Sequence, residues 1–85
     1  MMTAREARET IEKAREAKIA ERFERASEYC ELIGKQIEAE ANEEKSQLTV
    51  KNISSDIYYY IINILKENGY SLKPLENEYG LIVKW

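Results

Sequence analysis

The chain has 85 residues, of which 34% are charged and 44% hydrophobic, and its formal net charge is −3. It has no histidine and a single cysteine, Cys30, so neither an intrachain disulfide nor a zinc site is expected, and a reducing compartment is indicated. A chain of this length forms one domain and buries roughly 60–65% of its unfolded surface. Because small domains compensate with disulfides, metals or oligomerisation, we expect a homo-oligomer.

Residues 1–18 carry a charge every two or three positions and contain no apolar stretch. We therefore expect no signal peptide, no membrane span and no membrane partner, and a cytoplasmic location. The near balance of 13 basic and 16 acidic residues gives no overall attraction to nucleic acid or anionic lipid.

Residues 3–45 are rich in Glu, Arg, Lys and Ala and predict a long helix that begins at a capping box of Thr3 and Glu6. Its apolar positions form two stripes whose phases differ by about 100°. We predict a charged helical arm over residues 1–18 and a single α+β domain over residues 19–85, and we leave open a break near residues 15–18 or at Gly34. The first stripe is Ala4, Ala7, Ile11 and Ala14; the second is Ile19, Phe23, Ala26, Cys30, Ile33 and Ile37.

Residues 42–85 predict a β-α-β-β unit, with strands near 47–51, 70–73 and 79–85. Ser54 or Ser55 fits the N-cap of the intervening helix, and Gly69 fits the left-handed position that ends it. A right-handed crossover places the last strand between the other two, antiparallel to both. The predicted fold class is therefore α+β: a long N-terminal helix packed on a three-stranded sheet with the last strand central.

Four short motifs are present: T-A-R-E-A-R at residues 3–8, L-x-V at 48–50, L-x3-G-Y-x-L at 65–72 and Y-x-L-I-V-x-W at 79–85. Together they resemble a group of small uncharacterised proteins of tailed phages and prophages. The resemblance implies an accessory protein that acts inside a host bacterial cell. It implies no activity, and no functional residue is carried over from it.

The sequence indicates no catalytic centre. Histidine is missing as a base, no Gly-rich phosphate loop is present, and Ser54 and Ser55 fit a helix cap. Cys30 lies on the second apolar stripe beside Glu28 and Glu31, a setting that favours a buried thiol over a reactive one. We predict a protein that is not an enzyme and has no cofactor and no metal site.

Five basic residues of the long helix gather within about 100° on one side of the helical wheel, and most of its glutamates occupy the other side. One interpretation is a solvated surface of i,i+4 pairs such as Glu9–Lys13 and Glu21–Arg25. A second is self-association in which flanks of opposite sign meet. A third is binding of an acidic host protein or a phosphate-bearing ligand, a nucleotide or nucleic acid. The candidate binding residues are Arg8, Arg15, Lys18, Arg22 and Arg25.

Aromatic residues add a further candidate surface. Tyr58 and Tyr59 are candidate partner contacts, with packing under the first helix as the alternative, whereas the periodicity places Tyr60, Tyr79 and Trp85 in the core. The candidate oligomer contacts are Ala4, Ala7, Ile11 and Ala14.

The leading hypothesis is a non-enzymatic phage-type accessory protein that works as a homo-oligomer and modulates a host component. One alternative is a module that sequesters a phosphate-bearing small ligand, such as a nucleotide signal, or nucleic acid through the basic stripe. Another is a structural virion or assembly component.

Overall fold

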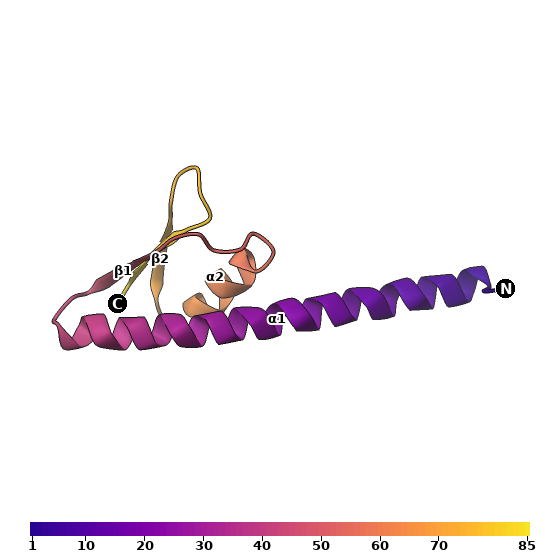
Figure 1. Cartoon of the computed structure of the whole chain (residues 1–85), viewed down its shortest axis with the longest axis horizontal. Coiled ribbons are helices and arrows are strands. Elements are labelled where there is room, and N and C mark those ends of the chain that lie inside the picture. Colours follow the sequence, from indigo (N-terminus) through magenta and orange to yellow (C-terminus); the bar gives the residue numbers. More distant parts are fainter.

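The computed structural model describes residues 1–85 and is dominated by one helix, α1 (Ala4–Asn42). α1 runs without a break through residues 15–18 and through Gly34 (Figure 1). The Thr3 hydroxyl oxygen accepts a hydrogen bond from the Glu6 N–H at 3.2 Å, which confirms the predicted N-cap. Two residues after the end of α1, Glu44 lies in the left-handed region at φ 64°, a conformation that is strained for a residue with a side chain.

The remaining chain forms a three-stranded sheet and a second helix. The strands are β1 (Gln47–Val50), β2 (Ser71–Pro74) and β3 (Leu81–Lys84), and their order is β1-β3-β2 with both pairings antiparallel. Leu48 and Leu72 pair with Val83 from opposite sides, so β3 is flanked along its length. The predicted central position of the last strand is confirmed.

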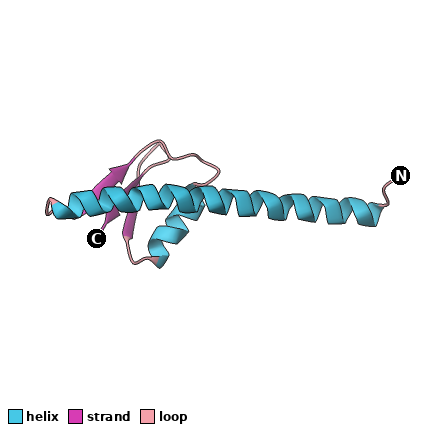
Figure 2. Ribbon diagram, turned by 60° about the horizontal axis from the view of Figure 1, so that its bottom comes forward, coloured by secondary structure: helices cyan, strands magenta, loops and turns pink.

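The second helix, α2 (Tyr58–Glu67), lies between β1 and β2 in the chain and packs with α1 against one face of the sheet (Figure 2). Its predicted end is confirmed: Gly69 has φ 87°, its N–H donates to the Lys66 carbonyl, and the Tyr70 N–H donates to the Leu65 carbonyl. Its predicted start is wrong. The N-cap position is Ile57, which has no side-chain cap, and the Ser54 hydroxyl, three residues earlier, donates to Asp56.

The core lies between the two helices and the inner face of the sheet. It takes Ala26, Ile33 and Ile37 from α1, all at most 6% exposed. The sheet, α2 and the loop before α2 supply the other buried residues, which are Val50, Ile53, Ile57, Tyr58, Ile61, Leu65, Leu81 and Val83.

Several residues expected in the core lie elsewhere. Ile19 and Phe23, on the second predicted stripe, are 52% and 54% exposed, because the elements that cover α1 end near Ala26. Tyr79 and Trp85 are 49% and 41% exposed, because β3 covers only residues 81–84 and both lie beyond its ends. Tyr60 is half-buried.

Candidate functional site

The N-terminal half of α1 projects from the rest of the molecule (Figure 1). The projecting half, residues 4–25, spans about 33 Å at 1.5 Å per residue, and the body, residues 26–85, holds every buried side chain. The radius of gyration is therefore 17.1 Å, against about 12 Å for a compact chain of this length. The projecting half is the most prominent surface without a partner in the molecule.

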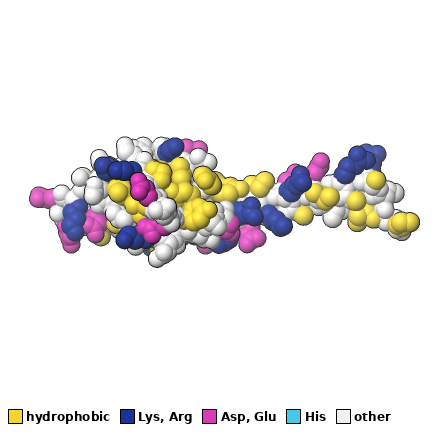
Figure 3. All heavy atoms as spheres, turned by 90° about the horizontal axis from the view of Figure 1, so that it is seen from above, with side chains coloured by type: hydrophobic (Ala, Val, Ile, Leu, Met, Phe, Trp, Pro, Cys, Tyr) yellow, Lys and Arg dark blue, Asp and Glu magenta, His cyan; other side chains and the backbone are white.

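Large hydrophobic side chains lie on the projecting half without cover. Ile11, Ile19 and Phe23 are 50%, 52% and 54% exposed. In Figure 3 hydrophobic side chains extend from the body onto the projecting half and appear again toward its end. Helices in proteins gain most of their stability from the packing of an apolar face, and this half makes no such packing within one chain.

The ion pairs of this region differ from the predicted ones. Arg5 pairs with Glu9 at 3.4 Å on the helix surface, and Arg25 reaches Asp56 of the body at 2.7 Å. The expected pairs Glu9–Lys13 and Glu21–Arg25 do not form. Arg25 ties α1 to the loop before α2, so it is engaged within the chain and differs from the other predicted binding residues.

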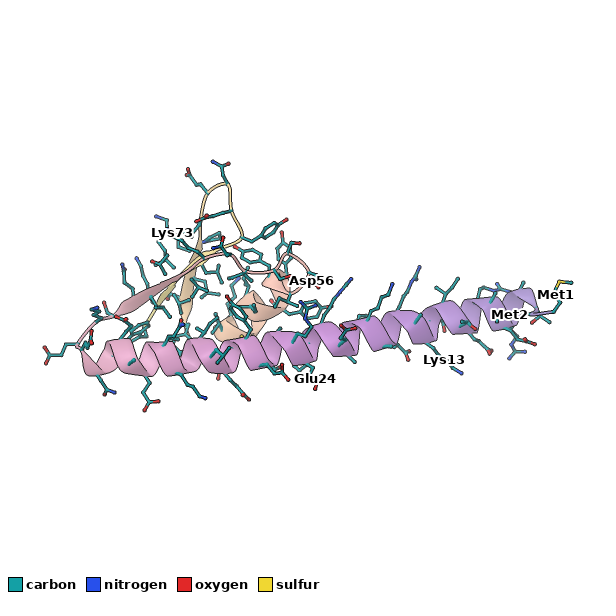
Figure 4. All side chains as sticks on the ribbon, in the orientation of Figure 1. Met1, Met2, Lys13, Glu24, Asp56 and Lys73 are labelled. Atoms are coloured by element: carbon teal, nitrogen blue, oxygen red, sulfur yellow. The ribbon has the colours of Figure 1, made fainter.

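Three of the candidate arginines lie on the side of α1 that faces the body. At 100° per residue, Arg8, Arg15 and Arg22 lie within about 30° of the direction that Ala26 and Ile33 take toward the core. None of these three arginines forms an ion pair, and neither does Lys18. The one side-chain hydrogen bond among them is donated by Arg8 to the Ala4 carbonyl, one turn earlier in α1, at 3.4 Å. Figure 4 shows the opposite side, where Lys13 and Glu24 point away from the body.

The first apolar stripe is turned by about 60° from the arginine side. Ala4, Ile11 and Ala14 are exposed and Ala7 is partly covered. Steps of seven residues from Ala4 and Ala7 extend this face along α1 as far as residue 39, and on a straight helix each step turns it by about 20°. The resulting heptad seam, used below under that name, is Ala4, Ala7, Ile11, Ala14, Lys18, Glu21, Arg25, Glu28, Leu32, Lys35 and Ala39.

A groove lies beside the seam where α1 crosses the body. Its cavity of about 360 Å³ lies between α1 and the connection from β1 to α2, and a smaller one of about 130 Å³ continues it toward β1. Tyr29 and Leu32 line both, with Ile57 in the first and Val50 in the second. Leu32 is 58% exposed, so the groove offers an open apolar wall. Sequence periodicity did not reveal this groove, because Asn52 and Ser54 reach it from a distant loop.

The two candidate tyrosines have different environments. Tyr58 is 6% exposed, and its hydroxyl donates to the Gly80 carbonyl at 3.1 Å, so it packs within the body and is not available to a partner. Burial raises the pKa of its phenol. Tyr59 is 68% exposed, and its ring meets that of Tyr58 edge to face, as does the ring of Tyr79. Tyr59 and Tyr79 are thus two exposed aromatic residues that both contact the buried Tyr58.

The molecule has few other side chains that are suited to chemical reaction or to metal binding. Cys30 lines a separate groove of about 260 Å³ between α1 and α2, and partial burial raises the pKa of its thiol, which lowers its reactivity. No group of three or more His, Cys, Asp or Glu side chains is placed to hold a metal ion. Neither helix combines the length and the hydrophobicity that a membrane crossing requires.

Comparison of the chain with protein-family models, with curated proteins and with solved structures finds no match.

Proposed function

We propose that this chain is a non-enzymatic interaction protein that works as a homo-oligomer built on α1. The observation that carries the proposal is the projecting half: residues 4–25 expose Ile11, Ile19 and Phe23 at about half of their surface, and none of these three side chains packs against the buried core. Covering apolar surface of this kind contributes about 25 cal/mol per Å². A second copy of the chain is a partner that is present wherever the protein is made.

The test compares two single substitutions on the projecting half. Ile11→Gln removes an apolar seam residue, and Lys13→Gln changes a residue that points away from the body on the other side of the helix (Figure 4). Gln is a good helix former, so both variants keep the helix. Analytical ultracentrifugation should show weaker association for Ile11→Gln only. Equal association of both variants with the parent chain contradicts this use of the seam.

The phage-type motifs extend the proposal to a second partner, a host component bound in the cytoplasm of a bacterium. The exposure of Tyr59 and Tyr79 supports the body as the contacting part, because aromatic side chains anchor protein interfaces. In a pull-down from bacterial lysate, Tyr59→Ser should lose a host protein that Lys66→Ser, a change at an exposed residue near the other end of α2, retains. Equal recovery by both variants removes the support for this surface.

The second candidate function is binding of a phosphate-bearing ligand. It is favoured by one observation: Arg8, Arg15 and Arg22 lie on one side of α1 at intervals of seven and have no acidic partner. Guanidinium groups bind phosphate oxygens in pairs of hydrogen bonds. Nucleotides should then raise the melting temperature of the parent chain but not of Arg15→Ala combined with Arg22→Ala. An absence of any shift for the parent chain rejects this candidate.

A further inference from the structure

Two copies of α1 can pair in two directions, and the charges in the middle of the heptad seam favour one of them over the other. The seam is apolar at Ala4, Ala7, Ile11 and Ala14 and then carries four charged residues in succession: Lys18, Glu21, Arg25 and Glu28. A two-fold pair of helices is either parallel or antiparallel, and these two arrangements bring different seam residues together.

In a parallel pair every seam residue meets its own copy. Lys18 then faces Lys18, Glu21 faces Glu21 and Glu28 faces Glu28. Charges of like sign at the centre of a helix interface are destabilising, and the aligned helix dipoles add to the repulsion. A parallel pair therefore gains from the apolar end of the seam and loses along its middle.

In an antiparallel pair a seam residue meets a different residue of the other chain. When Lys18 lies opposite Glu21, residue i lies opposite residue 39 − i, and two Lys18–Glu21 contacts form by symmetry. Ala7 then lies opposite Leu32, and Ile11 lies opposite Glu28 beside Tyr29. Ala7 and Ile11 of one seam thus lie at the groove wall of the other chain, where Leu32 is 58% exposed, whereas Ala4 and Ala14 lie opposite Lys35 and Arg25.

We propose that two copies of the chain pair antiparallel along the heptad seam, with Lys18 of each copy opposite Glu21 of the other and the apolar end of each seam on the partner's groove at Tyr29 and Leu32. This inference rests on the proposed self-association and specifies its geometry. The overlap covers residues 4–35, so each projecting half lies along the body half of its partner. Ile11 lies on the seam, whereas Ile19 and Phe23 lie more than about 90° from it on the helical wheel. Opposed helix dipoles favour the same arrangement.

A charge-reversal series tests the opposed pair. Lys18→Glu and Glu21→Lys each place like charges opposite one another in the antiparallel pair, twice per dimer. Each should weaken dimerisation about tenfold or more, since an exposed pair contributes up to about 1 kcal/mol and here attraction becomes repulsion. The double variant Lys18→Glu with Glu21→Lys restores the opposite charges and should restore the dissociation constant. Lys13→Glu, a change outside the seam, is the control and should have no effect.

The parallel arrangement gives a different result in this series. There Lys18→Glu replaces one like-charge contact with another and leaves the affinity nearly unchanged, and the double variant gains nothing over the single ones. Loss in both single variants without recovery in the double variant also contradicts the proposed register.

Distances between spin labels test the direction of pairing independently. With Cys30→Ala as background, labels are placed on Glu9→Cys or on Ala20→Cys, both outside the seam. In the antiparallel pair the two copies of residue 9 are about 31 Å apart along the helix axis, and those of residue 20 about 2 Å. The measured separation should therefore be clearly longer at residue 9. Equal separations at both positions overturn the antiparallel geometry while leaving self-association intact. A monomer in the same sample overturns the proposed function itself.

Discussion

Arg25 donates to the Asp56 carboxylate at 2.7 Å and thereby joins the last turn of the projecting half to the loop that precedes α2. The two residues are 31 positions apart in the chain. Ser54 donates to the same carboxylate, and this bond, followed by that from Arg25, holds the pKa of Asp56 below its ordinary value. The contact marks the point where α1 leaves the body.

Asp56→Asn should reduce the loss of stability in acid. The lowered pKa means that the folded protein holds the ionised carboxylate more tightly than the unfolded chain does. This contribution is present above the unfolded pKa of about 3.9 and is lost as the pH falls through the lower folded value. Urea unfolding between pH 6 and pH 2.5 should show a shallower acid decline for Asp56→Asn. The control Glu16→Gln should follow the parent chain, and an Asp56→Asn curve parallel to the parent contradicts the assignment.

Glu44→Gly should stabilise the body by about 1 kcal/mol, because Glu44 has φ 64° and only glycine adopts this region without steric cost. The Glu44 N–H donates to the Ala41 carbonyl, and this bond is kept in the variant. The melting temperature should rise by about 4–8 °C. Glu44→Gln removes the charge but keeps the side chain, so it separates conformational strain from charge; an equal rise in both variants assigns the effect to charge.

Gly80→Ala and Gly34→Ala should change stability in opposite directions. A Cβ at Gly80 would lie 2.5 Å from Leu75 Cδ1 and 2.8 Å from the Val50 carbonyl oxygen, and relieving this overlap costs about 1–3 kcal/mol. A Cβ at Gly34 meets nothing within 4 Å, and alanine in a helix interior is favoured by about 1 kcal/mol. Chemical unfolding of both variants measures the difference, and destabilisation by Gly34→Ala would mean that another group occupies the space beside it.

Tyr58→Phe should lower the free energy of unfolding by about 1 kcal/mol through loss of the buried hydrogen bond to Gly80. The cost stays moderate because the Gly80 carbonyl also accepts from the Leu75 N–H at 3.0 Å. Tyr59→Phe removes the same hydroxyl from a ring that is 68% exposed and should leave stability unchanged. Equal effects in the two variants would contradict the different environments of the two rings.

The elements of the fold follow from local chemistry, and so the sequence predicts them well. Thr3 begins α1, Gly69 ends α2, and the apolar character of residues 79–85 places the last strand in the centre of the sheet. Helical periodicity predicts the side of α1 on which Ile19 and Phe23 lie. It does not predict how far along α1 the body covers that side.

The candidate site is less predictable because it depends on contacts between distant segments. The Arg25–Asp56 pair and the groove beside Tyr29 and Leu32 both require the loop before α2, which no spacing within α1 indicates. Tyr58 is buried because α2 begins there and turns the ring toward the hairpin at Gly80. The positions of Arg8, Arg15 and Arg22 on one side of α1 followed from the sequence, since they need only the helical repeat.

Light scattering coupled to size-exclusion chromatography tests the central claim, self-association through α1, most directly. One chain has a mass of 10.0 kDa, so at high micromolar concentration the proposed antiparallel pair should give a mass of about 20 kDa. On dilution the measured mass should fall toward that of one chain. The Ile11→Gln variant should dissociate at a higher protein concentration than the Lys13→Gln variant does. A mass of 10.0 kDa for the parent chain at high micromolar concentration would contradict the claim.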